Sequence, residues 1–321
     1  MNPVSLNVRV ERKTQEALDI CIFELVDTSG KPLPAFSAGS HVDVTLPNGL
    51  TRQYSLCNDP QESHRYLIGV LKDPATRGGS RAMHDLVHVG DPLSISAPRN
   101  HFPLAHEAAH SLLLAGGIGV TPILCMAERL AIAGASFEMH YATRSRERTA
   151  FHDRIVQSGF APKVQFHFDD GDEAQKLKLP DLLATPRAGT HLYVCGPKGF
   201  MDAVLATARA NGWPPAQIHY EYFGAEATAK ADDGSFEVRL ASSGKVVLIP
   251  RDQSVTEALA QAGVEILTSC EQGVCGTCIT RVLEGEPDHR DLYFTPEEQA
   301  KNDQFTPCCS RSKSALLVLD L

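Results

Sequence analysis

Cysteines near the C-terminal end are the residues whose spacing most clearly indicates chemistry. Cys270, Cys275 and Cys278 follow the pattern C-x4-C-x2-C, and Cys308 comes later in the sequence. This is the spacing of plant-type ferredoxins, whose four thiolates hold a [2Fe–2S] cluster. Three thiolates on one tight loop can reach both irons, while the fourth arrives from a distant strand. The spacing therefore predicts a redox cluster held by these four residues.

The surroundings of these cysteines support a cluster and leave one ligand open. Gly273 and Gly276 allow the loop to wrap closely, so that amide N–H groups can point at the sulfurs. Zinc is the weaker alternative, because structural zinc usually takes two separated pairs of ligands. On spacing alone, either Cys308 or Cys309 can be the fourth ligand, and the other would be an ordinary thiol.

Composition indicates a globular protein of two or three domains. The chain has 321 residues, a hydrophobic fraction of 43% and a formal net charge of −9. No basic tract suggests nucleic-acid binding. The N-terminal residues lack the pattern of a signal peptide, and no apolar run is long enough to span a bilayer. We therefore expect a cytoplasmic protein, in which nine cysteines favour metal or redox chemistry over disulfides.

The first part of the chain, residues 1–103, is rich in short alternating segments. Turn signals such as Thr28-Ser-Gly30 and Pro47-Asn-Gly49 separate them. Six such strands predict an antiparallel β-barrel. A helix-like piece over residues 80–87 follows Gly78-Gly79 and interrupts the strands.

The middle part, residues 104–225, alternates strand-like and helix-like segments. Strands are expected at 111–115, 137–142, 163–168, 191–195 and 219–222, and helices at 122–133 and 199–211. This alternation predicts a parallel α/β sheet. Residues 226–235 are small, polar and charged, which suits a linker. Strands and a helix before the cysteines then indicate a third domain over residues 236–321.

Two glycine turns of the middle part indicate a dinucleotide site. The first, residues 115–122, contains Gly116, Gly117 and Gly119, follows a strand and opens a helix. It is not the G-x-G-x-x-G fingerprint, but helix N-termini beside glycines still suit a diphosphate. Thr121 suits the N-cap of that helix and Pro122 its first position. The second turn, residues 195–199, follows a later strand of the same sheet, where ligands bind.

The loop after the second strand bears on the choice between NADH and NADPH. Residues 143–148 contain Arg144, Arg146 and Arg148 and lack the acidic residue expected for a plain ribose. Three arginines can accept a 2′-phosphate. The alternative is that they are surface charges on a solvated loop.

The strand at residues 52–58 is a candidate flavin site. Arg52 and Tyr54 would share one face, and Ser55 would point the other way. An Arg beside a Tyr on a barrel edge can hold a phosphate and cover an aromatic ring, although such a segment is more often an ordinary strand. Arg77-Gly-Gly-Ser80, just before the short helix, adds an anion site that fits the phosphate of FMN.

Taken in order, these motifs resemble the phthalate dioxygenase reductase family over essentially the whole chain. They are R-x-Y-S-L, R-G-G-S, G-G-I-G-x-T-P, C-G-P, E-x-F-G, the cysteine pattern and G-E-x-D-H-R-D at residues 285–291. The resemblance implies an FMN-binding barrel, then an NADH-binding domain, then a β-grasp [2Fe–2S] ferredoxin domain. Related reductases for benzoate-type oxygenases place the ferredoxin first and use FAD.

The resemblance also implies roles for individual residues. It favours Cys308 over Cys309, and it places Phe223 as a lid on the flavin ring until the nicotinamide displaces it. The residues that it implies for cofactor binding are Arg52, Gln53, Tyr54, Ser55, Val70, Gly79, Ser80, Gly116, Gly117, Gly119, Thr121, Thr143, Arg144, Cys195, Gly196, Pro197 and Phe223.

The implied function is electron transfer from NADH through FMN to the cluster, and then to a Rieske-type oxygenase that acts on an aromatic acid. Because the cofactors perform this chemistry, we predict no acid–base residue, and His289 is expected to be structural or a docking residue. Glu284, Glu286, Asp288 and Asp291 are either docking residues or a solvated face. We expect a monomer that binds no membrane.

Two other functions are compatible with the motifs. The acceptor could be a cytochrome P450 or a separate ferredoxin instead of an oxygenase. A metal-dependent regulatory protein with decayed nucleotide sites is the third hypothesis, and the intact glycine turns argue against it.

Overall fold

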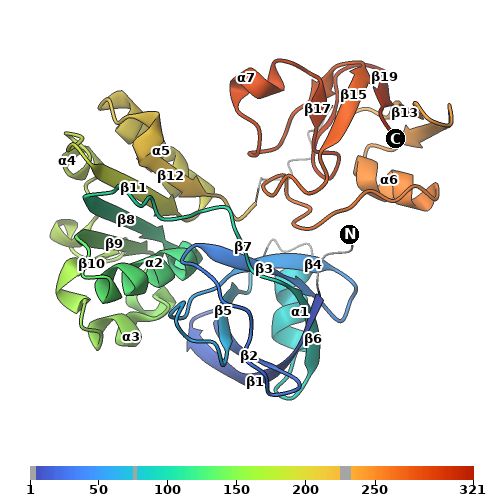
Figure 1. Ribbon diagram of the computed structural model, residues 1–321. Coiled ribbons are helices and arrows are strands. Elements are labelled where there is room, and N and C mark those ends of the chain that lie inside the picture. Colours follow the sequence, from blue (N-terminus) through green and yellow to red (C-terminus); the bar gives the residue numbers. More distant parts are fainter. Residues whose placement is uncertain (1–4, 75–77, 225–232) are drawn as a thin grey trace. The chain divides into compact units, whose positions relative to one another are not determined.

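A computed structural model describes residues 5–74, 78–224 and 233–321 of the chain. The chain divides into two compact units, Met1–Tyr222 and Phe223–Leu321 (Figure 1). Arg77 and most of the expected linker, residues 226–232, lie outside the described residues. None of the described helices combines the length and the apolar character needed to cross a membrane.

The first unit begins with an antiparallel sheet in the order β4-β3-β6-β1-β2-β5, with β7 beside β3. A bridge between Leu56 and Ile68 joins the two ends of this sheet and closes it as a barrel. Along β1, Val8 and Val10 are buried while Arg9 is exposed, as the alternation of a strand requires. The elements are β1 (Ser5–Ala17), β2 (Ile20–Asp27), β3 (Ser40–Thr45), β4 (Thr51–Ser55), β5 (Tyr66–Leu71), α1 (Gly79–Leu86), β6 (Pro92–Ser96) and β7 (Arg99–Asn100).

The same unit continues as a parallel five-stranded sheet in the order β10-β9-β8-β11-β12. Its central strand β8 is an almost uninterrupted buried apolar run, because helices cover both faces of the sheet. The elements are β8 (His110–Gly116), α2 (Val120–Ile132), β9 (Phe137–Thr143), α3 (His152–Val156), β10 (Val164–Phe168), α4 (Leu179–Leu182), β11 (Thr190–Cys195), α5 (Lys198–Ala210) and β12 (Ile218–Glu221).

The start of α2 differs from the expectation. The helix begins at Val120 with Gly119 as its N-cap, so Thr121 and Pro122 lie inside the first turn. The Thr121 hydroxyl donates a hydrogen bond to the carbonyl of Ile118 at 3.1 Å instead of capping the helix. A one-turn 3₁₀ segment, Gly117–Gly119, leads into the helix and moves its start forward.

The second unit is a mixed five-stranded sheet in the order β14-β13-β19-β15-β17, packed on α6. Ser254 and Glu257 form a capping box at the start of α6, and Val255 and Leu259 face the core. This is the expected β-grasp arrangement. The elements are β13 (Phe236–Leu240), β14 (Val246–Ile249), α6 (Val255–Gln261), β15 (Thr280–Glu284), β16 (Pro287–Asp288), α7 (Pro296–Gln299), β17 (Gln304–Phe305), β18 (Arg311–Ser312) and β19 (Leu316–Leu319).

Candidate functional site

The two glycine turns lie against each other at the centre of the parallel sheet. Strands β8 and β11 are neighbours there. From β8 the chain continues through β9 to β10 at one edge of the sheet, and it then returns to the other side of β8 to form β11 and β12. A Cβ on Gly119 would come within 2.3 Å of the Cys195 carbonyl oxygen, and one on Gly196 within 2.9 Å of the Gly116 Cα. Only glycine fits at these contacts. The turns therefore bring the starts of α2 and α5 together at the carboxyl ends of β8 and β11, the position at which α/β sheets bind nucleotides.

Residues of the barrel lie beside the same turns. A Cβ on Gly69 of β5 would lie 2.9 Å from the methyl group of Thr121. The start of α2 therefore packs against β5, next to Val70. On the other side, the Ser55 hydroxyl of β4 donates a hydrogen bond of 3.3 Å to Glu221 of β12. Three predicted residues from different elements thus lie beside the glycine turns: Ser55 of β4, Val70 of β5 and Thr121 of α2.

Glu221 is a functional candidate that the sequence prediction missed. It lies opposite Cys195 in the register of β11 and β12, and its side chain is 16% exposed. Burial raises the pKa of Glu221 from 4.5 to about 7, and the Ser55 hydrogen bond opposes that rise. The only sequence signal was the glutamate of E-x-F-G, which carries no indication of burial. A carboxyl of this kind can hold or release a proton near neutral pH.

His41 and Cys195 are uncharged neighbours of Glu221. His41 faces Ser55 across β3 and β4, and its Nδ1 lies 4.0 Å from Glu221. Burial lowers the pKa of His41 to about 4, with help from His101 and Arg99. Burial also raises the pKa of Cys195 well above its usual value. Apart from Glu221, these side chains stay neutral at physiological pH.

A cradle for an anion forms where Arg52 meets the start of α1. A Cβ on Gly79 would lie 2.7 Å from both Cγ and Nε of Arg52, so the arginine rests directly on the glycine. Gly78 has φ of 94° and caps α1 without a side-chain hydrogen bond. The Ser80 hydroxyl accepts a hydrogen bond from the amide of Asp73 at 3.2 Å. A buried guanidinium beside a helix N-terminus suits a phosphate.

Two of the three arginines in the nucleotide loop are already paired. Arg146 donates to Asp153 at 2.9 Å, and Arg148 donates to Asp19 of the barrel at 3.1 Å. Arg144 is exposed, and no residue of the described segments forms an ion pair with it. Arg146 and Arg148 are therefore engaged by acidic residues, and Arg144 is the one arginine of this loop without an ion pair to a described residue.

In the second unit, the four predicted cysteines are buried and lie in two pairs. Hydrogen-bond contact joins Cys270 to Cys275 and Cys278 to Cys308. Within the described part of the chain, no group of three or more Cys, His, Asp or Glu side chains could hold a single metal ion. Each tetrahedral iron of a [2Fe–2S] cluster has two bridging sulfides and needs only two protein thiolates. Two pairs of thiols therefore fit this cluster better than a mononuclear zinc site.

The loop also supplies amide groups to the sulfurs. The Gln272 amide donates to Cys270 Sγ at 3.3 Å, and the Thr277 amide donates to Cys275 Sγ at 3.5 Å. Gly273 has a φ of 68°, a conformation that other residues rarely adopt. Hydrogen bonds of this kind stabilise charge on thiolate ligands and tune a cluster's potential.

Cys308 and Cys309 contact each other but differ in their other neighbours. Cys308 also contacts Cys278. Cys309 Sγ lies 3.3 Å from the Thr306 hydroxyl and 3.8 Å from the Ser310 hydroxyl. These contacts favour Cys308 as the fourth ligand and Cys309 as a neighbouring thiol.

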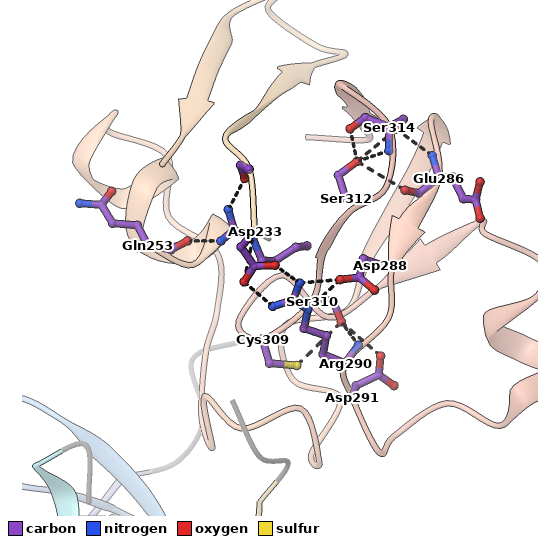
Figure 2. Close-up of polar contacts among 12 residues, drawn as sticks. Asp233, Gln253, Glu286, Asp288, Arg290, Asp291, Cys309, Ser310, Ser312 and Ser314 are labelled. Carbon is purple, nitrogen blue, oxygen red and sulfur yellow. Dashed lines mark hydrogen bonds and ion pairs between the residues drawn. The ribbon is translucent and has the colours of Figure 1, made fainter. Parts of the chain in front are cut away.

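The four acidic residues considered above for docking do not form a free acidic face. Asp291 is buried, so the docking hypothesis is wrong for this residue. Asp288 binds Arg290 (Figure 2), Glu284 pairs with Arg239 at 3.2 Å, and Glu286 pairs with Lys313 at 2.7 Å. His289 is 7% exposed and lies 3.3 Å from Asp291, which agrees with a structural role.

Comparison with known proteins identifies the family. Residues 238–313 match the 2Fe-2S iron-sulfur cluster binding domain, and residues 96–218 match the N-terminal domain of the dimethylamine monooxygenase subunit DmmA-like family. The chain is 58% identical to vanillate O-demethylase oxidoreductase of Pseudomonas putida, over 97% of this chain and 98% of that protein.

Two solved structures extend this likeness. A type IV self-sufficient cytochrome P450 monooxygenase is 40% identical with a TM-score of 0.78, over 99% of this chain and 41% of that one. The structure of phthalate dioxygenase reductase, described as modular for electron transfer from pyridine nucleotides to [2Fe-2S], is 42% identical with a TM-score of 0.83, over 99% of this chain and 98% of that one. With the glycine turns, the anion cradle and the paired cysteines, these matches show that the chain belongs to the phthalate dioxygenase reductase family.

Proposed function

We propose that this protein is the reductase component of a two-component oxygenase system. It would oxidise NADH and deliver single electrons to a terminal oxygenase. The observation that carries the proposal is that the two glycine turns lie against each other and beside Ser55, Thr121 and Glu221. When bound, FMN would accept the hydride's two electrons and the [2Fe–2S] cluster would take them one at a time.

The barrel would hold FMN through the residues of the cradle. Arg52, Gly79 and Ser80 would bind its phosphate, because a guanidinium and a helix start converge there. Gln53, Tyr54, Ser55 and Val70 would border the ring. Because burial raises the pKa of Glu221 to about 7, the carboxyl beside Ser55 would carry only part of a negative charge at neutral pH, close to the group that accepts electrons.

The parallel sheet would hold the dinucleotide. The turns that contain Gly116, Gly117, Gly119, Gly196 and Pro197 would bind the diphosphate at the starts of α2 and α5. Thr121 and Cys195 would border the nicotinamide, and Thr143 and Arg144 the adenosine ribose. The pairing of Arg146 and Arg148 with acidic residues supports NADH over NADPH.

The second unit would hold the cluster. Cys270, Cys275, Cys278 and Cys308 would be its ligands, as their two buried pairs support. Phe223 is the first residue of this unit and is 39% exposed, and we propose it as the aromatic lid on the flavin ring.

Among acceptors, an oxygenase component has the strongest support. The relatives named above include an oxidoreductase of vanillate O-demethylase, so we propose a Rieske-type oxygenase that acts on an aromatic acid, with the reductase as a monomer. A cytochrome P450 is the second candidate, because the chain is 40% identical to part of a self-sufficient P450.

Reconstitution tests the acceptor. The purified reductase is mixed with NADH, oxygen and either a purified Rieske-type vanillate demethylase oxygenase or a purified P450 haem domain. We expect aromatic product with the oxygenase and little turnover with the haem domain. NADH oxidation that yields product only with the haem domain would support the second candidate instead.

A further inference from the structure

Residues 288–291 of the second unit belong to two buried sets of hydrogen bonds, one around Arg290 and one around Asp291 (Figure 2). The guanidinium of Arg290 binds Asp288 at 2.8 Å through Nε and Asp233 at 2.9 Å through Nη1. The next residue, Asp291, makes none of these contacts and has its own set of partners. The positive charge of Arg290 is therefore engaged by other carboxylates and not by Asp291.

Asp291 is a buried carboxylate with three hydrogen-bond donors around it. Its side chain is 0% exposed. Oδ2 accepts a hydrogen bond of 2.9 Å from the amide of Phe294. Oδ1 accepts one of 3.3 Å from the Ser310 hydroxyl and lies 3.3 Å from Nδ1 of His289. Both oxygens of this buried carboxylate therefore have hydrogen-bond partners, as buried polar groups require.

The same residue touches both segments that bring the cluster cysteines together. A Cβ on Gly273, in the middle of the loop between Cys270 and Cys275, would lie 3.0 Å from the Cα of Asp291 and 3.1 Å from its Cβ. The amide of Leu292 donates to the Gly273 carbonyl at 2.9 Å. Through Ser310, Asp291 also holds the segment that begins at Cys308.

We propose that Asp291 is a positioning residue for the [2Fe–2S] cluster that also lowers its reduction potential. It fixes the ligand loop against the Cys308 segment, and its buried charge opposes the arrival of an electron because charges interact strongly in a low dielectric. This inference rests on the proposed ligand set of four cysteines. It gives a role to the second Asp of the G-E-x-D-H-R-D motif, which the proposed function leaves unexplained.

The test is the midpoint potential of the cluster in the full-length, cofactor-loaded chain. Asp291→Asn keeps the shape of the side chain, and its amide can still accept from Phe294 and donate to Ser310. Asp288→Asn is the matched control, because this carboxylate belongs to the same segment but binds Arg290 instead of the loop. We expect Asp291→Asn to raise the potential and Asp288→Asn to leave it close to the wild-type value. An Asp291→Asn protein with full iron and sulfide content and an unchanged potential would overturn the proposal.

A second variant keeps the test decisive if Asp291→Asn loses its cluster. Ser310→Ala removes one donor from the Asp291 carboxylate and leaves its charge less compensated, so the potential should fall. An unchanged or raised potential in Ser310→Ala contradicts the proposal. Failure of the cluster assignment itself would be distinct, because the wild-type protein would then contain no stoichiometric iron and sulfide.

Discussion

The Glu221 carboxyl accepts a hydrogen bond from the Ser55 hydroxyl at 3.3 Å, and this bond joins β12 of the parallel sheet to β4 of the barrel. The two residues are separated by most of the first unit in sequence. Their contact places a group with a pKa of about 7 between the proposed flavin and nicotinamide sites. The charge at this contact therefore changes near neutral pH.

Replacing Glu221 with Gln should stabilise the flavin-free protein at high pH. Below pH 4.5 the carboxyl is protonated in the folded and the unfolded chain, so its burial carries no charge penalty. As the pH rises from 4.5 to 7 the unfolded chain loses its proton first, and the wild-type protein loses stability relative to the variant. The full difference in the free energy of unfolding is on the order of 3 kcal/mol, because each unit of pKa shift corresponds to about 1.36 kcal/mol.

Thermal unfolding at pH 5 and pH 8 measures this effect. The gain in melting temperature of Glu221→Gln over wild type should be larger at pH 8. Glu147→Gln, which changes an exposed carboxylate, should show no such difference. An equal gain at both pH values would show that burial does not shift the pKa of Glu221.

Substitution of the two adjacent cysteines separates the ligand from its neighbour. Cys308→Ser should lose most of the [2Fe–2S] absorbance, because Cys308 faces Cys278. Cys309→Ser should retain it, since Cys309 contacts Thr306 and Ser310. Iron and acid-labile sulfide are measured in both variants after purification without air. Loss of the cluster in Cys309→Ser alone would reverse the assignment.

Arg52→Lys should weaken FMN binding without unfolding the barrel. A lysine keeps the charge but loses the planar fork that binds a phosphate through two hydrogen bonds. Loss of a charge-assisted hydrogen bond costs about 1.5–3 kcal/mol, or roughly ten- to hundredfold in Kd. Fluorescence titration of the flavin-free protein measures this constant. Arg65→Lys is the control, because Arg65 binds Glu62 and Glu24 elsewhere on the barrel. Equal weakening in both variants would argue against the cradle.

The nucleotide loop predicts a preference for NADH. The kcat/KM for NADH should exceed that for NADPH by at least about tenfold, since Arg146 and Arg148 are already bound to Asp153 and Asp19 and are not available to a 2′-phosphate. Arg144→Ala should raise the KM for NADH a few-fold and leave kcat unchanged, while Arg146→Ala should change neither. A preference for NADPH that disappears in Arg146→Ala would show that this arginine leaves Asp153 to bind the 2′-phosphate.

The sequence was sufficient for those features that depend on local patterns. Alternating apolar residues located the barrel strands, and glycines at strand ends located the turns around Gly119 and Gly196. Features that depend on contacts between residues far apart in the sequence could not be predicted. Glu221 is buried beside Ser55 and Asp291 is buried beside Ser310, and neither contact follows from the residue types near them in the chain. The start of α2 was misplaced because the preceding 3₁₀ turn makes Gly119 the cap.

The most direct test of the central claim is whether NADH reduces the cluster only when the flavin is bound. The loaded protein is mixed with NADH without air, and cluster reduction is followed by EPR, in parallel with protein from which FMN has been removed and with that protein after FMN is restored. We predict rapid cluster reduction in the first and third samples. In the second, the cluster should stay oxidised with NADH and be reduced by dithionite. Rapid reduction by NADH in the flavin-free protein, or none in the loaded protein, would contradict the proposed path of electrons.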